Sequence, residues 1–198
     1  RPILAVGGDL KNAVALVVDG QAFVSQHVGD LDHVPARDAF VETVRDLCAM
    51  YRIREDELLI AHDAHPEYAS TAYARAMPGE HVAVQHHRAH VASVLAERGE
   101  WEREVLGAAF DGTGFGDDGT IWGGEFFAGS VRGGFARAAH LRGAQLPGGD
   151  AAARFPVQAA AGFLSELSDV PYVTAAPFAF PARYELARAM IVKNVRVF

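Results

Sequence analysis

The sequence predicts an α/β fold in which two lobes each open with three strands. Short apolar segments bounded by glycine, asparagine and aspartate alternate with longer segments whose apolar residues recur every three or four positions, which is typical of strands alternating with helices. A three-strand pattern with a glycine-rich first turn begins near residue 3 and again near residue 105. The 198 residues suffice for one large domain or two small ones.

The first predicted lobe, residues 1–104, has the order β-β-β-α-β-α-β-α. Asp19-Gly20 is a strong two-residue hairpin signal between the second and third strands. Phe40, Val44 and Leu47 recur at helical spacing in the first helix. The predicted strands are 3–6, 13–18, 21–26, 58–61 and 82–84, and the predicted helices are 35–52, 67–76 and 87–98.

The second predicted lobe, residues 105–198, repeats the three strands and then departs from the pattern. Two lobes of this kind grip nucleotide phosphates in actin-like and sugar-kinase-like ATPases, which is an analogy of fold alone. The strands and helices that would finish the lobe are absent, so we expect the chain to be part of a longer polypeptide. The predicted elements are strands 105–110, 121–128 and 135–141, a glycine-rich turn at 111–119, helices 151–167 and 182–192, and a loop containing Pro171 and Pro177.

Composition excludes several classes of protein. The formal net charge is −7 and no basic segment stands out, so we expect no nucleic-acid partner. No segment approaches the roughly 20 apolar residues of a membrane-spanning helix, and no signal-peptide pattern is visible. The single cysteine, Cys48, rules out an internal disulfide, fits a helix core position and agrees with a cytoplasmic location.

His86, His90 and Asp111 form a candidate metal site. The two histidines are four positions apart, so on one helix they share a face and can bind one ion. Asp111 follows the next strand and can add a carboxylate, a set that suits iron, zinc or manganese. A zinc protease would need glutamate where this chain has His87. The alternative is surface histidines at the start of a helix.

The turn Gly112-Thr113-Gly114 is a candidate phosphate site. Its glycines let main-chain N–H groups approach phosphate oxygens, and Thr113 offers a hydroxyl donor. Lys11 and Asn12 occupy the first glycine-rich turn, where a lysine can meet a β- or γ-phosphate. The competing interpretations are an ordinary glycine-rich hairpin and a solvated turn lysine.

Several other polar residues allow two interpretations. His62, Asp63 and His65 follow a buried strand, so they either contact a substrate or cap the next helix. Asp117-Asp118-Gly119 indicates turn chemistry rather than a second metal site. Arg154 either binds an anion or forms a surface salt bridge.

Together these motifs resemble HypF, the carbamoyltransferase family that matures nickel–iron hydrogenases. The most specific run, DGTGFGDDGTIWGGE at 111–125, separates HypF from antibiotic O-carbamoyltransferases and tRNA threonylcarbamoyl-transfer proteins. The resemblance covers nearly the whole chain. The other matching runs are GDLKN at 8–12, SQHVGD at 25–30, HDAHP at 62–66, QHHRAH at 85–90 and LPGGD at 146–150.

The resemblance implies a fold and an activity. HypF is a multidomain enzyme, and this chain is similar to the N-terminal part of its Kae1-like domain, which has an actin-like, RNase H-like (ASKHA) fold whose second lobe is incomplete here. In the family, carbamoyl phosphate and ATP give carbamoyl-adenylate. The Kae1-like domain then moves the carbamoyl group to the C-terminal cysteine of HypE, where dehydration yields the cyanide ligand.

The resemblance also implies site residues. By motif, His86, His90 and Asp111 match the catalytic ligands of a divalent metal ion, iron, zinc or magnesium. Lys11, Asn12 and the turn Gly112-Thr113-Gly114 fall where contacts to the ATP-derived nucleotide are expected.

Two departures from the family pattern leave alternatives open. The family continues Gly-Gly-Asp with Arg-Glu-Pro and a further arginine, whereas this chain has Arg154-Phe155-Pro156 and Gln158. The family's last lobe, which holds much of the adenosine site, would follow Phe198, so we expect the chain alone to be inactive. The open alternatives are an O-carbamoyltransferase acting on a small-molecule hydroxyl and a non-catalytic nucleotide-binding or docking module.

Overall fold

The computed structural model describes residues 1–149, 151–167 and 181–195. The chain forms two compact units, Arg1–His140 and Leu141–Phe198. The predicted lobes, 1–104 and 105–198, divide the chain by the repeat of strands rather than by contacts, and that division stays a prediction. Predictions that involve Asp150, Pro171 and Pro177 lie outside the described residues.

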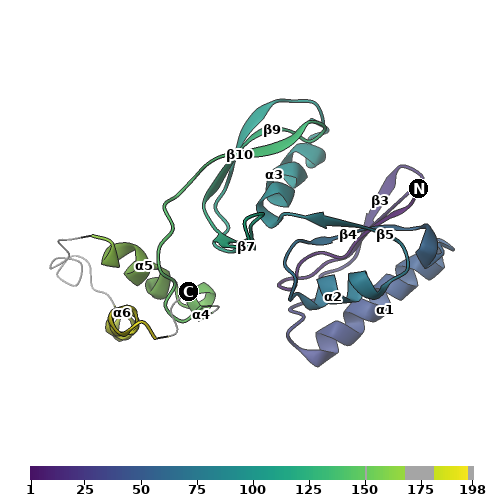
Figure 1. Ribbon diagram of the computed structural model, residues 1–198. Coiled ribbons are helices and arrows are strands. Elements are labelled where there is room, and N and C mark those ends of the chain that lie inside the picture. Colours follow the sequence, from purple (N-terminus) through teal and green to yellow (C-terminus); the bar gives the residue numbers. More distant parts are fainter. Residues whose placement is uncertain (150, 168–180, 196–198) are drawn as a thin grey trace. The chain divides into compact units, whose positions relative to one another are not determined.

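The first unit contains a five-stranded sheet in the order β3-β2-β1-β4-β5 (Figure 1). Strand β1 is central because it pairs antiparallel with β2 and parallel with β4. The hairpin predicted at Asp19-Gly20 is confirmed, since both residues have positive φ (50° and 76°), as a tight turn between β2 and β3 requires. The strands are β1 (Ile3–Ala5), β2 (Ala15–Val18), β3 (Gln21–Val24), β4 (Leu59–Asp63) and β5 (Glu80–Val84).

Helices α1 (Val34–Met50) and α2 (Ala69–Ala76) cover one face of this sheet, and a short 3₁₀ helix, η1 (Glu55–Glu57), precedes β4 (Figure 1). Burial of apolar side chains between helix and sheet is the main stabilising term here. Cys48 is buried among them, so its predicted core position is confirmed. The core includes Leu4, Val6, Val14, Leu16, Phe40, Val44, Leu58 and Ile60.

The first unit continues with helix α3 (His86–Glu97) and a second sheet in the order β10-β9-β6. Its strands are β6 (Val105–Ala109), β9 (Glu125–Ser130) and β10 (Gly134–His140), all antiparallel, so the predicted return of the three-strand pattern is confirmed. Helix α3 packs on β6 and β9. The second core consists of Val91, Leu95, Ala109, Trp122 and Phe127.

The single strand predicted for 121–128 is wrong. The structure has β8 (Ile121–Trp122), which pairs with β7 (Gly114–Phe115), and then β9. The chain turns at Gly123 and Gly124: a Cβ on Gly123 would lie 2.5 Å from the carbonyl oxygen of Gly112, and Gly124 has a φ of 77°. The predicted turn at 111–119 therefore contains a short strand.

The second unit contains α4 (Ala151–Arg154), α5 (Pro156–Ser165) and α6 (Ala182–Lys193). The single helix predicted for 151–167 is wrong, because the helix breaks at Phe155. Pro156 has no N–H to donate and disfavours helical backbone in the residue before it. Ala161, Tyr184 and Ala187 are buried in the core of this unit.

Candidate metal centre

The candidate site lies where three segments of the first unit meet. β4 ends at Asp63, α3 begins at His86 just after β5, and Asp111 follows β6 by two residues. β4 and β5 are parallel neighbours, so their carboxyl ends lie at the same edge of the sheet. α3 packs against β6, and this packing brings Asp111 to the first turn of the helix.

His86, His90 and Asp111 converge as predicted. Oδ2 of Asp111 lies 2.8 Å from Nε2 of His86 and 3.2 Å from Nε2 of His90, and the two ring nitrogens are 3.2 Å apart. The three ligand atoms lie within 4.8 Å of one another. Two imidazole nitrogens and a carboxylate oxygen fit a transition-metal or zinc ion. His86 is half-buried and the other two are exposed, so the site is open to solvent.

Asp63 holds the other side of the His86 ring. It is 8% exposed, and its Oδ2 lies 2.8 Å from Nδ1 of His86. Its Oδ1 accepts a hydrogen bond of 2.8 Å from the main-chain N–H of His65, so the carboxylate is fixed in place. Metal-binding histidines usually donate their second ring N–H to such a partner. Asp63 therefore directs the Nε2 lone pair of neutral His86 toward Asp111.

The charges of the site shift two pKa values. The hydrogen bond to Asp63 raises the pKa of His86; burial opposes this shift, while the charge of Asp63 and the contact with Asp111 add to it. Burial is the largest influence on Asp111 and would raise its pKa, but the combined hydrogen bonds and charges of His86 and His90 bring that pKa below its usual value. Without an ion, the site therefore favours a protonated His86 beside an ionised Asp111.

Without a bound ion, stability should depend on His86 over a defined pH range. Because the folded chain holds the His86 proton more tightly than the unfolded chain, this stabilisation is fully present below about pH 6.5 and is lost as pH rises through the raised pKa. We expect the unfolding free energy of the wild type, measured with urea in chelator, to fall more than that of His86→Gln between about pH 6 and pH 9. Equal pH profiles would contradict this assignment.

The first glycine-rich turn is held by its own polar groups. The side-chain N–H groups of Asn12, which is 1% exposed, donate to the main-chain oxygens of Val6 (2.8 Å) and Gly8 (2.7 Å). The main-chain N–H of Lys11 donates to Asp30 (2.8 Å), and Lys11 itself is exposed. A phosphate contact by Lys11 or Asn12 stays a prediction.

Asp9 caps α2 from a distant part of the sequence. Its carboxylate accepts hydrogen bonds from the main-chain N–H groups of Ala69 (2.8 Å) and Ser70 (3.0 Å). These N–H groups have no partner within the helix, and the negative charge interacts favourably with the helix N-terminus. Asp9 therefore caps α2, a role that the sequence had also allowed for His62, Asp63 and His65.

The second glycine-rich turn is shaped by close packing. Gly114 is buried, and a Cβ there would lie 2.6 Å from Cε1 of His87. This packing explains the glycine at position 114. Gly112 and Thr113 are exposed next to Asp111, and phosphate binding by the turn Gly112-Thr113-Gly114 stays a prediction.

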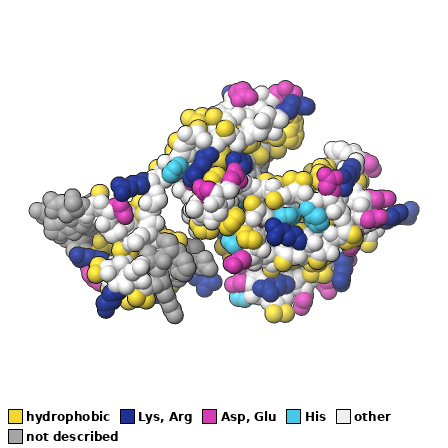
Figure 2. Space-filling view, viewed as in Figure 1, with side chains coloured by type: hydrophobic (Ala, Val, Ile, Leu, Met, Phe, Trp, Pro, Cys, Tyr) yellow, Lys and Arg dark blue, Asp and Glu magenta, His cyan; other side chains and the backbone are white. Residues whose placement is uncertain are grey.

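Asp117 and Asp118 have the turn role predicted for them. Oδ1 of Asp118 accepts hydrogen bonds from the main-chain N–H of Thr120 (3.0 Å) and from Nε1 of Trp122 (2.9 Å). Asp117 forms an ion pair of 2.7 Å with Arg88 of α3. In Figure 2, basic and acidic side chains lie next to one another in several places on the face that is shown. The contacts of Asp117 and Asp118 hold the 111–125 segment together and attach it to α3.

A buried ion pair was not foreseen from the sequence. Glu125, 1% exposed in β9, receives hydrogen bonds from Nε (2.6 Å) and Nη2 (3.0 Å) of Arg137 in β10. The guanidinium also lies 3.8 Å from the ring centroid of Trp122. The sequence signal was a glutamate directly before the apolar residues 126–128, but its arginine partner is not in register with it, because Glu125 lies opposite His140 and Arg137 opposite Phe127.

A mostly apolar groove of about 480 Å³ adjoins the site between α3 and β6. Its lining includes His90 and Asp111. Val94, Leu106 and Phe110, which also line it, are exposed apolar side chains. The candidate ligands therefore border an open surface that a substrate can reach.

The departures from the family pattern lie in the second unit. Arg154 is exposed at the end of α4, so the structure leaves both its interpretations open. Gln158 is 5% exposed, and its Nε2 donates a hydrogen bond of 2.8 Å to the main-chain oxygen of Pro147. Gln158 therefore holds the segment before α4 in place.

Among the residues that the structure describes, none of the helices combines the length and the apolar character that a membrane span requires.

Comparison with known families and proteins gives a consistent result. The family described as "HypF Kae1-like domain" matches residues 1–97, and "Carbamoyltransferase, Kae1-like Domain, second subdomain" matches residues 107–198. The chain is 47% identical over 167 residues to "Carbamoyltransferase HypF2" of Cupriavidus necator, covering 82% of this chain and 20% of that protein. It is 43% identical to "Carbamoyltransferase HypF" of Synechocystis, covering 83% and 21%. The chain thus spans about a fifth of these relatives.

Two solved structures share the fold. The crystal structure of full-length HypF in the phosphate- and nucleotide-bound form aligns with a TM-score of 0.82 and 33% identity, covering all of this chain and 30% of that one. HypF of T. kodakarensis aligns with a TM-score of 0.77 and 30% identity, covering 99% and 27%. The predicted α/β fold of the Kae1-like type is therefore confirmed, and the chain belongs to the HypF Kae1-like domain family.

Proposed function

We propose that this chain is the Kae1-like module of a HypF-type carbamoyltransferase that moves a carbamoyl group from carbamoyl-adenylate, made from carbamoyl phosphate and ATP, to the C-terminal cysteine of HypE. The product serves as precursor of the cyanide ligand of nickel–iron hydrogenase. The observation that carries the proposal is the convergence of His86, His90 and Asp111 beside an exposed glycine turn. We place this work in the cytoplasm, as expected for a chain with one buried free cysteine.

The proposed reaction is an acyl transfer. The cysteine thiolate adds to the carbamoyl carbon, the bond from that carbon to the adenylate phosphate oxygen breaks, and AMP leaves with the bonding electron pair. The products are a thiocarbamate and AMP, and the thiol proton goes to solvent or to a nearby base. Such a transfer needs alignment of the reactants and stabilisation of the leaving phosphate more than it needs a protein nucleophile.

The residues of the site have distinct roles in this proposal. His86, His90 and Asp111 hold a divalent ion, and Asp63 keeps the His86 ring in the productive orientation. An ion bound there supplies a Lewis acid that polarises the carbonyl group or stabilises the leaving phosphate. The exposed turn at Gly112 and Thr113 offers donors to phosphate oxygens next to the ligands.

The test is carbamoyl transfer by a protein that carries this chain together with the remaining HypF domains. We expect His86→Ala to abolish transfer to a HypE C-terminal peptide while leaving carbamoyl phosphate-dependent adenylate formation intact, because only the transfer site is damaged. Mass spectrometry of the peptide measures the transfer step, and release of pyrophosphate from ATP measures the formation of the adenylate.

His33→Ala is the matched control, because His33 is an exposed histidine in the same unit and lies outside the site. Unchanged transfer by His86→Ala would overturn the metal role. Transfer to a small alcohol but not to the thiol peptide would replace the proposal with an O-carbamoyltransferase. Nucleotide or HypE binding without any transfer would favour a docking module.

A further inference from the structure

His87 is a fully buried histidine between two candidate metal ligands, and the proposed chemistry does not use it. It is the second residue of α3 and has no exposed surface. Nδ1 of its ring lies 3.1 Å from Nε2 of Gln85, and its Nε2 lies 2.9 Å from the main-chain oxygen of Asp111. A buried polar side chain with both ring nitrogens engaged has a defined position and a defined tautomer.

The main chain fixes the orientation of the Gln85 amide. Its Oε1 accepts the main-chain N–H of Arg88 at 3.0 Å, and its Nε2 lies 3.2 Å from the main-chain oxygen of Phe115. A flipped amide would place a donor against an N–H and an acceptor against a carbonyl oxygen. The group that faces His87 is therefore the NH₂ group, which can only donate.

The tautomer of His87 follows from that orientation. Because Nδ1 accepts from Gln85, the ring proton of neutral His87 is on Nε2, which donates to the carbonyl oxygen of Asp111. Neither nitrogen is left with a lone pair for a metal ion. His87 is thus set apart from its neighbour His86 and from His90, whose Nε2 atoms face the Asp111 carboxylate.

The same two side chains hold the 111–115 segment at both ends. His87 binds the carbonyl oxygen of Asp111, and Gln85 binds that of Phe115. Between them, Gly114 packs directly on the imidazole, where a Cβ would lie 2.6 Å from Cε1. The segment that carries the Asp111 carboxylate is therefore attached to the helix turn that carries the two histidine ligands.

We infer that His87, oriented by Gln85, is a positioning residue that sets the distance between the Asp111 carboxylate and the His86–His90 pair. The inference rests on the proposed metal role of those three residues. Supporting groups of this kind typically change metal affinity 10- to 100-fold when they are lost.

The test uses two substitutions that differ in where they place an amide. The side-chain amide of glutamine reaches about as far as Nε2 of histidine and can keep the bond to Asp111, whereas that of asparagine reaches only about as far as Nδ1. We expect His87→Gln to bind Co²⁺ within about threefold of the wild type and His87→Asn to bind it roughly 10- to 100-fold more weakly. Calorimetry and the visible spectrum of bound Co²⁺ measure this on the 198-residue chain.

His81→Gln is the matched control, because His81 also contacts a main-chain oxygen, that of Met77, but lies outside the site. The ¹⁵N–¹H spectrum of the imidazoles provides a second readout that needs no metal, and we expect the His87 signal to show the Nε2–H tautomer. Wild-type affinity in His87→Asn, or the Nδ1–H tautomer, would overturn the inference while leaving the metal site intact. Absence of Co²⁺ binding by the wild type, or undiminished binding by His90→Ala, would overturn the proposed metal role and the inference with it.

Discussion

Replacing Glu125 with alanine should lower the free energy of unfolding by about 3–5 kcal/mol. The substitution leaves the Arg137 guanidinium, whose side chain is 24% exposed, without the carboxylate that accepts two of its hydrogen bonds. It also removes the acceptor of the Gly123 main-chain N–H at 3.2 Å. Arg137 keeps the carboxylate of Asp118 at 3.7 Å, but removing the hydrogen-bonded carboxylate from a mostly buried ion pair still costs far more than removing one from an exposed pair. Urea denaturation followed by circular dichroism measures the change.

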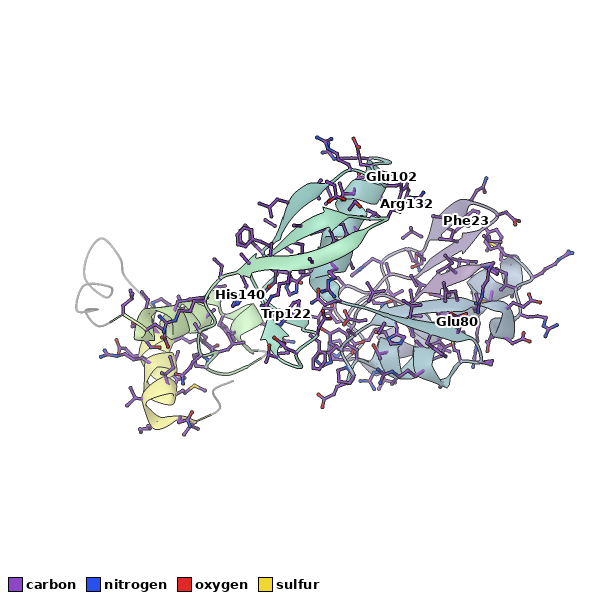
Figure 3. The ribbon with its side chains drawn as sticks, turned by 45° about the horizontal axis from the view of Figure 1, so that its top comes forward. Phe23, Glu80, Glu102, Trp122, Arg132 and His140 are labelled. Atoms are coloured by element: carbon purple, nitrogen blue, oxygen red, sulfur yellow. The ribbon has the colours of Figure 1, made fainter. Side chains whose placement is uncertain are left out.

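Glu102→Ala is the matched control in the same half of the first unit. Glu102 pairs with Arg132, but both side chains are mostly exposed, 73% and 72% (Figure 3). Exposed pairs contribute about 0–1 kcal/mol, so we expect little change. If Glu125→Ala cost no more than this control, the structural importance assigned to the buried pair would be wrong.

Asp63→Asn should weaken metal binding roughly 10- to 100-fold without unfolding the chain. The asparagine oxygen can still accept the His65 N–H, so its NH₂ group faces Nδ1 of His86. Nδ1 must then act as acceptor, which moves the ring proton of neutral His86 to Nε2, the atom that should bind the ion. Calorimetric titration with Co²⁺ or Zn²⁺ measures the loss.

Asp9→Asn separates this effect from a general loss of stability. Asp9 is a carboxylate of the same unit, and it accepts its hydrogen bonds from the start of α2 rather than from the candidate ligands. Asparagine keeps only one acceptor oxygen for the two N–H groups and has no charge at the helix N-terminus, so we expect it to lower the unfolding free energy by about 1 kcal/mol and to leave metal affinity unchanged. Equal loss of affinity in both variants would show that Asp63 acts through the fold rather than through the His86 ring.

The sequence predicted correctly those features that depend on residues close together in the chain. The four-residue spacing of His86 and His90 predicted a shared helical face because helix geometry repeats over that distance. The Asp19-Gly20 hairpin was predictable because positive φ is a property of those residue types. Asp111 was placed correctly because it follows a clear apolar strand.

The support of the site depends on contacts between distant residues. Asp63 reaches His86 across 23 positions because β4 and β5 pair in parallel, and no local pattern specifies that pairing. Nothing in the sequence indicated that Gln85 and His87 support the site, because their partners, Phe115 and Asp111, belong to the segment after β6. The break at Gly123-Gly124 had a visible signal, since paired glycines in a strand pattern often mark a close approach of another segment.

The positions of the three candidate ligands couple metal binding to the stability of the first unit. His86 and His90 belong to the helix that follows the five-stranded sheet, whereas Asp111 follows the first strand of the three-stranded sheet. The three ligands are brought together only in the folded chain, so an ion held by all three would bind the folded chain more tightly than the unfolded one. By mass action it would add about 4 kcal/mol when its free concentration is about a thousand times its dissociation constant. Metal supply would then affect the stability of this unit as well as its chemistry, since chelation would favour local opening between α3 and the segment that follows β6.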